Sequence, residues 1–388
     1  MKVRTKVKAC LVVSIFLLGI NCATAVGRTI YVDNDGPADF NTIQAAIDDS
    51  NDGDTIIVAD GIYKGEGNRD INFNGKAITV RSTNGPQNCI IDCNGSESDR
   101  HRGFRFVSGE DANSVIMAFT ITNGYAQYEV YMPPLGVSEY LGGAIYCWRS
   151  SPTISDCIIS CNRAGTGFGG GISCVFSNAT MSNCTFTSNW ARVGGGIDII
   201  YGSPTVTNCT LAGNVAESVG GIRDDENTKV TNCILWGNRD KGGIDESAQI
   251  YGSEMVVNYC CIQGLTGALG GIGNIGDDPY FADPCNDDYH LKSQAGRWEP
   301  NSQNWVHDGV TSPCIDAGDI DSPVGLETFP NGGRINMGAF GGTAEASKSY
   351  FGEPVCTTIV AGDINGDCKV GFLDFSIMAL HWLRDENK

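Results

Sequence analysis

The chain is poor in positive charge and in histidine. Its 388 residues contain 26 Lys and Arg against 45 Asp and Glu, so the formal net charge is −19. Such an acidic surface repels nucleic acid and anionic membranes, so no nucleic-acid partner is expected. It also disfavours an anionic polysaccharide unless cations bridge the two. The four histidines, His101, His290, His307 and His381, are scattered without the spacing of a metal site.

Long hydrophobic runs are also scarce. One apolar run, from Cys10 to Ile20, follows a basic start and precedes an "ATA" site that ends at Ala25. The run is too short to span a membrane and is typical of a secretory signal, which we predict for residues 1–25. A lipoprotein signal at Cys22 fits less well, because Asn21 stands where a small residue is expected. The protein is therefore predicted to be secreted, extracellular or at the cell surface, with no membrane span.

The region after the signal has no repeated segment of helical length, which argues against helical and leucine-rich repeats. It has instead short β-branched stretches and a recurring frame, as in "NCTLAGN" at 208–214. The cysteines Cys157, Cys184, Cys209 and Cys233 are 27, 25 and 24 residues apart, and Cys260 follows after another 27. Each unit begins with a glycine run and an Ile. This period predicts an all-β, right-handed parallel β-helix.

Identical positions of neighbouring coils in such a fold stack at about 4.8 Å. The frame therefore predicts an inward-facing column of Cys89, Cys157, Cys184, Cys209 and Cys233, with Ala118 in the same place in "MAFTITN". A second column would stack at a corner, where Asn tolerates the left-handed conformation. It comprises Asn94, Asn123, Asn162, Asn189, Asn214 and Asn238. Local disulfides between Cys89 and Cys93 or between Cys147 and Cys174 stay open.

The two ends of the repeat region have distinct sequences. Residues 29–63 predict strands around a short amphipathic helix, whose Ile43, Ala46 and Ile47 would cover the open end of the solenoid. We predict a β-helix over residues 26–345, with the cap and first coils at 26–84 and a closing segment at 276–345. Residues 346–388 form a linker and a small tail module.

Aligning the coils on the Ile of each glycine run gives a candidate site. The next, outward-facing positions are Tyr146, Ser173, Asp198, Arg223 and Asp245. Asp198, Arg223 and Asp245 would be consecutive neighbours, and we take them as candidate catalytic residues. Asp224, Glu246 and Tyr146 are candidate substrate-binding residues. The alternative is a solvated ladder of salt bridges on the solenoid face.

Three stretches resemble known β-helix proteins. "DFNTIQAAID" and "GDTIIVADGIY" are similar to the start of pectinesterases and other members of the pectate-lyase-like superfamily. "SPCIDAG" and "NMGAFG" resemble the end of many secreted bacterial β-helix proteins. The resemblance implies a pectin-lyase-like solenoid with a polysaccharide partner. Lyases of this superfamily use acids to hold calcium and an Arg or Lys as base, whereas its hydrolases use clustered aspartates. The "QAV"-like and "DFIFG"-like stretches of pectinesterases are not found.

The tail carries a possible calcium loop, "DINGDCKVGFLD" at 363–374. Oxygen ligands stand at loop positions 1, 3, 5 and 12, and position 7 supplies a backbone carbonyl. These residues are Asp363, Asn365, Asp367, Asp374 and, at position 7, Lys369. The loop and the apolar face that follows resemble one repeat of a type I dockerin. That resemblance implies calcium as a cofactor and a cohesin-like or cell-surface partner. Cys368 stands where a glycine is expected, and a second loop is missing.

Two functions from different classes follow. The first is an extracellular protein that binds a polysaccharide and, if the Asp198 group is catalytic, degrades it as a lyase or a glycoside hydrolase. The second is a non-catalytic adhesion or structural protein of a surface or matrix, in which the β-helix is a rigid spacer. Clustered carboxylates with a basic partner favour the first, and the lack of a strict active-site motif favours the second.

Overall fold

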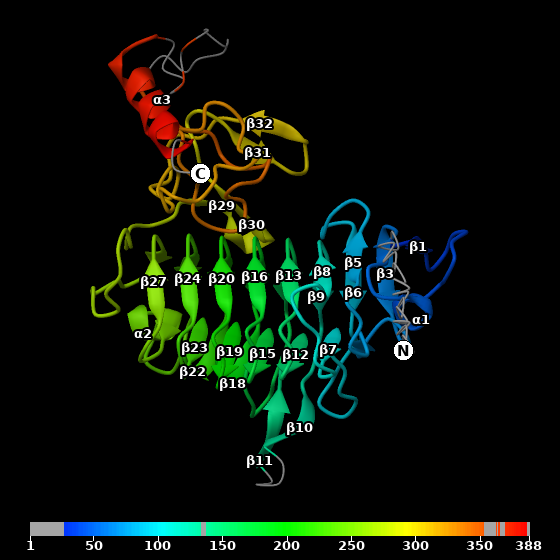
Figure 1. The fold of residues 1–388 in the computed structure, drawn as a ribbon. Helices are drawn as coiled ribbons and strands as arrows, with labels where there is room; N and C mark the ends of the chain where they lie inside the picture. The colour runs from blue at the N-terminus through cyan, green and yellow to red at the C-terminus, as the bar shows by residue number, and fades with distance from the viewer. Residues whose placement is uncertain (1–26, 133–136, 353–361, 363, 365–368, 386–388) are drawn as a thin grey trace, which may run out of the picture.

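The protein folds as a parallel β-solenoid with three sheets, which confirms the predicted fold class (Figure 1). The computed structural model describes residues 27–132, 137–352, 362, 364 and 369–385. The predicted signal segment, residues 1–25, lies outside this range. Each full coil contributes one strand to each sheet in turn, so residues about 25 apart lie side by side.

Sheet A has nine strands, all parallel. In spatial order they are β1 (Thr29–Val32), β2 (Thr55–Val58), β5 (Thr79–Ser82), β8 (Val115–Met117), β13 (Thr153–Ser155), β16 (Thr180–Ser182), β20 (Thr205–Thr207), β24 (Lys229–Thr231) and β27 (Val256–Asn258).

Sheet B has eight parallel strands and follows sheet A in each coil. They are β3 (Gly61–Lys64), β6 (Cys89–Asp92), β9 (Thr120–Thr122), β14 (Ile158–Ser160), β17 (Thr185–Thr187), β21 (Thr210–Ala212), β25 (Ile234–Trp236) and β28 (Cys261–Ile262). The middle residue of a three-residue strand points inward, as Ile159, Phe186 and Leu211 do, and the flanking residues point outward.

Sheet C has seven parallel strands. They are β4 (Ile71–Asn72), β7 (Phe104–Phe106), β12 (Ile145–Trp148), β15 (Ile172–Val175), β19 (Ile197–Ile200), β23 (Ile222–Asp224) and β26 (Ile250–Tyr251). Two further short strands, β18 (Trp190–Val193) and β22 (Val215–Ser218), pair in the turn between sheets B and C.

The predicted cysteine column lines the interior. Cys157, Cys184, Cys209, Cys233 and Cys260 belong to one buried core, and each thiol donates to the backbone carbonyl two residues earlier. All the cysteines of the described residues are free, so the two local disulfides left open do not form in this structure. Burial raises the pKa of the Cys209 thiol well above its usual value, so it stays neutral.

One position of this column was predicted wrongly. Phe119, not Ala118, lies beside Cys157, because Ile158 pairs with Thr120 in the parallel register. Ala118 instead takes the left-handed corner position, with φ of 65°. The coil is displaced by one residue relative to the Cys-to-Asn frame, and the large Phe119 ring fills the place of a thiol.

The asparagine column is confirmed for four coils. Asn162, Asn189, Asn214 and Asn238 are fully buried. The side-chain oxygens of the last three each accept from both the backbone N–H and the amide of the Asn one coil earlier, and the Asn162 oxygen accepts from the backbone N–H of Gly124. In the last step the acceptor is Gln249. The left-handed residue is the one before each Asn, whereas Asn94 and Asn123 themselves have positive φ and do not join this ladder.

Glycine runs allow adjacent coils to approach closely. Gly143, Gly170 and Gly195 stack on one another at the entry to sheet C, and a Cβ on Gly170 would lie 2.5 Å from the carbonyl oxygen of Gly195. Any larger residue would push the coils apart. The repeated "GG" before each Ile therefore reflects a packing requirement.

The N-terminal end is closed as predicted. Helix α1 (Ile43–Asp49) buries Ile43, Ala46 and Ile47 against the first coils. The other end is covered by the loop that follows β28, where Leu265 and Leu269 pack against the core. Helix α2 (Glu246–Gln249) precedes β26 in the last coil.

Residues 276–349, here called the flanking segment, do not close the end of the solenoid, as had been predicted for residues 276–345. They pack against the outer face of sheet B, through Phe281, Leu291 and Met337 on one side and Ala212 and Ile234 on the other. Figure 1 shows this segment along the flank of the last coils. It contains the pairs β29 (Phe281–Asp283) with β30 (Asp288–Leu291) and β31 (Arg297–Glu299) with β32 (Asn304–Val306), and a 3-10 turn, η1 (Pro284–Asn286).

Residues 125–141 contain four tyrosines, Tyr125, Tyr128, Tyr131 and Tyr140. This stretch includes an antiparallel hairpin, β10 (Gln127–Met132) and β11 (Val137–Leu141), that projects on the side away from the flanking segment (Figure 1). The Arg100 guanidinium lies 4.6 Å from the ring centre of Tyr125 and 4.0 Å from that of Tyr140. The rings thus pack against the hairpin's own base. The tail ends in helix α3 (Phe372–Asp385).

The asparagine ladder gives a test of the fold. Asn189→Ala should lower the free energy of unfolding by about 2–4 kcal/mol, because two buried donors of Asn162 would lose their shared acceptor. Urea denaturation followed by circular dichroism measures the change. Asn113→Ala, at an exposed turn residue, is the control and should change stability by less than about 0.5 kcal/mol. Equal effects in the two variants would contradict a stabilising role of the ladder.

Candidate functional site

Two of the three predicted catalytic residues are neighbours. Asp198 in β19 pairs in register with Arg223 in β23, and the Arg223 Nη1 atom lies 3.3 Å from Asp198 Oδ1. The second Arg223 nitrogen, Nη2, lies 2.8 Å from Asp225 Oδ2. Arg223 thus bridges a buried and an exposed carboxylate. Their catalytic role stays a prediction.

Asp198 is not on an exposed surface, although it faces away from the main core. Its side chain is 0% exposed, and its Oδ2 atom has no hydrogen-bond partner among the described residues. The Oγ atom of Ser173, the register partner of Asp198 in β15, is also buried without a partner. Burial raises the pKa of Asp198 to about 7, and the opposing charge of Arg223 offsets this only in part.

The third residue, Asp245, was misplaced by the alignment of glycine runs. Arg223 is paired with Tyr251, because Ile250 and not Ile244 stands opposite Ile222. Asp245 instead caps helix α2, and its side chain accepts from the backbone N–H of Ser247 and Ala248. In this coil a short helix, α2, is inserted between the glycine run and strand β26. The glycine pattern alone does not reveal this insertion.

The three predicted substrate-binding residues are buried. The side chain of Asp224 accepts from the backbone N–H of Glu226 and Thr228, and that of Glu246 accepts from the Thr266 hydroxyl at 2.8 Å. Tyr146 packs in a small apolar cluster outside sheet C, and burial raises the pKa of its phenol. These contacts hold turns and a packed layer together, and none of the three side chains is accessible to a polymer.

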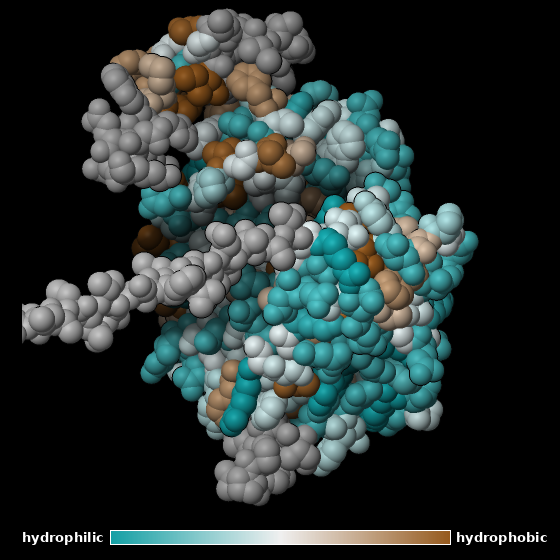
Figure 2. Space-filling model, turned by 45° about the vertical axis from the view of Figure 1, so that its right-hand side comes forward, coloured by the Kyte–Doolittle hydropathy of each residue, from teal (hydrophilic) through white to brown (hydrophobic). Residues whose placement is uncertain are grey.

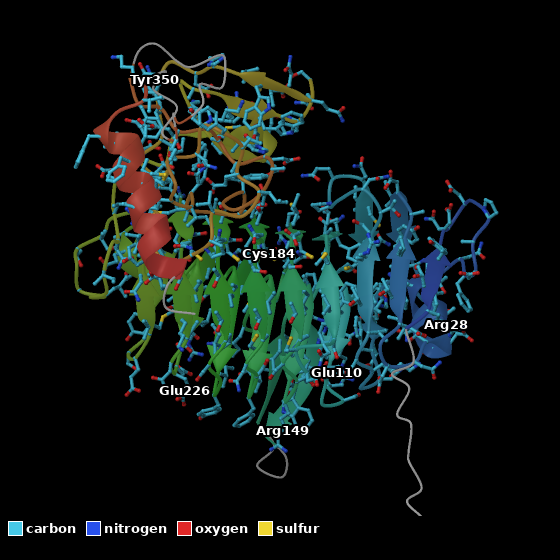
Figure 3. The ribbon with its side chains drawn as sticks, turned by 45° about the horizontal axis from the view of Figure 1, so that its top comes forward. Arg28, Glu110, Arg149, Cys184, Glu226 and Tyr350 are labelled. Atoms are coloured by element: carbon cyan, nitrogen blue, oxygen red, sulfur yellow. The ribbon has the colours of Figure 1, made fainter. Side chains whose placement is uncertain are left out.

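A cleft of about 530 Å³ lies elsewhere, between the outer face of sheet B and the flanking segment. Its floor includes Ile158, Thr185 and Thr187, and one wall is formed by residues 286–290 and 339–345. The loop Asn84 to Gln87 closes the far side. A volume of this size is typical of ligand sites. In Figure 3, Cys184 marks the coil beneath it, while Arg149 and Glu226 mark a distant edge.

The cleft begins at the coil in which the corner residue between sheets A and B is an aspartate instead of an asparagine. Asn183 and Asn208 have positive φ at the corner between sheets A and B, and their amide groups donate to the Gly341 carbonyl of the flanking segment. Asp156 occupies the same corner one coil earlier, with φ of 53°. A carboxylate cannot donate to a carbonyl. Asp156 therefore faces the cleft, and its burial raises its pKa.

His290 lies in the wall of the cleft between two carboxylates. Its Nδ1 atom is 2.6 Å from Asp288 Oδ1, and its Nε2 atom is 3.4 Å from Glu345 Oε2. The ring stacks on Phe340 at a centroid distance of 3.6 Å. Burial lowers the pKa of His290, but the two hydrogen-bonded carboxylates outweigh it and raise the pKa above its usual value. The acids on both sides thus favour the protonated form of the imidazole.

Sequence reasoning missed this cleft. Its lining residues are up to about 260 residues apart in the chain, from residue 84 to residue 345. His290 had been set aside as one of four scattered histidines. One signal was available: Asp156 stands in "DCIISCN" where the following units have Asn before the Cys.

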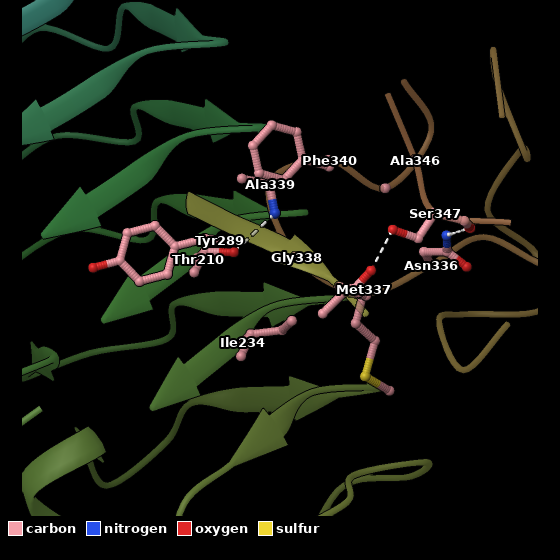
Figure 4. Close-up of a pocket in the computed structure, with 12 residues that line it drawn as sticks. Thr210, Ile234, Tyr289, Asn336, Met337, Gly338, Ala339, Phe340, Ala346 and Ser347 are labelled. Atoms are coloured by element: carbon pink, nitrogen blue, oxygen red, sulfur yellow. Dashed lines mark hydrogen bonds between the residues drawn. The ribbon is translucent and has the colours of Figure 1, made fainter. Parts of the chain in front are cut away.

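A second cavity, between Thr210, Ile234 and Met337, has a volume of only about 10 Å³ (Figure 4). The Ala339 N–H donates to the Thr210 hydroxyl at 3.0 Å beside it. This is a packed interface with room for about one water molecule. It holds the flanking segment on sheet B.

The described residues contain no group of three His, Cys, Asp or Glu side chains placed to hold a metal ion. Asp363, Asn365 and Asp367 of the predicted calcium loop lie outside the described residues. No helix among the described residues is both long and apolar enough to cross a membrane. The face visible in Figure 2 is mostly hydrophilic, with apolar residues in small groups.

Comparisons with known proteins give limited matches. A family described as "Disaggregatase related" matches residues 226–318, which cover the last coils and part of the flanking segment. A search of curated proteins finds no significant match. Among solved structures, a pectin methylesterase from carrot is similar with 13% identity and a TM-score of 0.34, over 64% of this chain and 86% of that one. The fold assignment rests on the strand register described above.

The buried Asp198 predicts a pH dependence of stability. Its folded pKa, about 7, is above the usual 3.8, so the folded state keeps a proton that the unfolded chain releases. The stabilisation that this proton gives to the folded state is fully present below about pH 4 and is lost as the pH rises to about 7. We expect the free energy of unfolding to fall by about 2–4 kcal/mol over this range. Buried Glu327 and Asp316, with pKa values of about 7 and about 6, act in the same direction.

Asp198→Asn should make this pH dependence shallower, which urea denaturation between pH 4 and pH 8 measures. Asp225→Asn is the matched control, because it removes the exposed carboxylate that pairs with the same guanidinium. An identical pH profile of Asp198→Asn and the unchanged protein would show that Asp198 is ionised throughout.

Proposed function

We propose that this protein is a secreted, extracellular polysaccharide-binding β-solenoid and that the cleft beside sheet B holds a segment of the glycan. The cleft is the observation on which the proposal depends. It combines a volume of about 530 Å³ with a lining of hydrogen-bonding side chains and the rings of Tyr289 and Phe340. Sugars present hydroxyl groups at their edges and C–H groups on their faces, which suit such a lining.

If the protein cleaves its glycan, the cleft favours hydrolysis over elimination. Among the described residues that line it there is no Lys or Arg to act as the base of a lyase, whereas several carboxyl groups are present. Glycosidic hydrolysis requires one carboxylic acid that protonates the leaving oxygen and a second carboxylate. The carboxyl groups that line the cleft supply candidates for both roles.

The proposal is tested by blocking the cleft. Gln87 is exposed at its rim, so Gln87→Trp should fill part of the cavity without disturbing the core. We expect binding on a glycan panel, measured by affinity electrophoresis and calorimetry, to weaken at least about tenfold, which corresponds to about 1.4 kcal/mol. A reducing-end assay on the same samples reports hydrolysis.

The matched control is Glu226→Trp, which places an equally large side chain at the edge distant from the cleft (Figure 3). Its binding should equal that of the unchanged protein. If both tryptophan variants bind as well as the unchanged chain, the glycan lies elsewhere. If the unchanged chain binds no glycan, the second function, a non-catalytic adhesive or structural solenoid, is favoured.

One observation favours that second function over catalysis at the sequence-predicted site. Asp245 is separated from Asp198 and Arg223, and the predicted substrate-binding residues are buried. In that function the cleft would have no role, and the solenoid would be a rigid spacer between a cell or matrix surface and a partner.

We also propose that the tail binds calcium. The Asp374 carboxylate is buried, and it accepts from the backbone N–H of Ile364 at 2.7 Å and of Gly371 at 2.6 Å. The position-12 carboxylate is thus turned into the loop at the start of α3, as a ligand would be. Asp363, Asn365, Asp367 and the carbonyl of Lys369 would complete the set, and a cohesin-like or cell-surface partner would dock on this module.

Calcium binding by the tail should be visible in calorimetry. The chain from residue 27 to 388 should release or absorb heat on calcium addition, whereas the chain ending at residue 349 should not. Asp363→Ala should weaken binding, because position 1 of the loop is a direct ligand. Equal heats from the full and shortened chains would place the calcium on the solenoid.

A further inference from the structure

We infer that the cleft selects an uncharged glycan and rejects a polyuronate. The inference rests on the proposed function and adds the class of ligand to it. It departs from what the resemblance to pectin-active proteins implies, and it is carried by the charges that line the cavity.

The charged side chains of the cleft are almost all acidic. Asp156, Asp287, Asp288 and Glu345 line it, and among the described lining residues His290 is the one basic side chain. A uronate carboxylate that entered would lie within several ångströms of these acids. Like charges at that range repel strongly where water is partly excluded, and salt screens them only over about 8–10 Å.

His290 does not compensate for these acids. Asp288 and Glu345 are within hydrogen-bonding distance of its two ring nitrogens, at 2.6 and 3.4 Å. The imidazole has only two N–H donors, and both are directed to protein carboxylates. His290 therefore has no donor left for a ligand carboxylate. Asp288 also pairs with Arg297, at 3.4 Å, and Arg297 pairs in turn with Asp308, at 3.2 Å. With His290 protonated, these five side chains carry two positive and three negative charges, and Arg297 does not line the cleft.

The remaining polar lining suits hydroxyl groups. Gln87, Thr185, Thr187 and Asn301 contribute neutral donors and acceptors, and Phe340 contributes an apolar ring. Neutral amides and hydroxyls bind sugar hydroxyls without requiring a countercharge. The cleft therefore has the groups that recognise an uncharged chain and lacks the Lys or Arg that would hold an anionic one.

Two substitutions can remove negative charge without altering the backbone. Asp156 and Asp287 both have positive φ, of 53° and 60°. Asn tolerates this conformation, and Asn183, Asn208 and Asn232 already occupy the corner position of Asp156 in the next coils. The double variant Asp156→Asn/Asp287→Asn is therefore nearly isosteric.

The test compares glycans that differ in charge alone. Oligogalacturonate and its full methyl ester share one backbone, and neutral β-glucan, mannan and galactan oligomers extend the panel. Calorimetry in a chelating buffer should show binding of at least one uncharged glycan and at least about tenfold weaker binding of its anionic counterpart or of oligogalacturonate. In Asp156→Asn/Asp287→Asn the difference should shrink to about threefold or less.

The outcomes separate the inference from the proposed function. The unchanged chain could bind oligogalacturonate as tightly as any uncharged glycan and lose this binding in Gln87→Trp. That result would overturn the inference and keep the cleft as the glycan site. Discrimination that is unchanged in the double variant would also overturn it, because the lining acids would not be its cause. Absence of all glycan binding would overturn both.

Discussion

The structure depends on the registered stacking of coils, and the buried asparagine ladder is its most demanding part. Each side-chain oxygen from Asn189 to Gln249 accepts two hydrogen bonds from the coil before it. A coil shifted by one residue would leave both donors unsatisfied in the interior, where an unpaired polar group costs about 1–3 kcal/mol. The ladder thus fixes the register of the coils from Asn162 to Gln249, and with it the direction of their outward-facing side chains.

The cleft follows from this register together with one change of chemistry. At the corner between sheets A and B, amide groups at successive coils can donate to the flanking segment, and Asn183 and Asn208 hold it through the Gly341 carbonyl. At Asp156 the donor is lost, and the flanking segment no longer contacts the corner through a side-chain amide. The cavity of about 530 Å³ lies above sheet B at this point, and the stacked rings of His290 and Phe340 form part of its wall.

Features that repeat from coil to coil could be predicted from the sequence, whereas features that depend on irregular coils could not. The period of the cysteines predicted the column and the fold, because stacking converts spacing directly into contact. The displaced coil at Phe119 and the helical turn before Ile250 broke the frame, so Ala118 and Asp245 were misplaced. The cleft could not be predicted, because the docking of residues 276–349 on a flank is not periodic. Asp198 and Arg223 were predicted as neighbours, but their burial depends on packing outside sheet C.

For the proposed glycan ligand, the charges that line the cleft are a stronger guide than the fold. A parallel solenoid offers the same floor of short strands to any polymer, so the fold alone does not select among glycans. Selection depends on which side chains stand at the few positions that face the ligand. Here Asp156 replaces a recurring Asn, and Asp287, Asp288 and Glu345 come from the flanking segment. An acidic wall was thus added to a neutral floor by a segment outside the repeats. If the cleft holds a glycan as proposed, the segment that docks on the solenoid determines the ligand class, while the solenoid determines where that segment can dock.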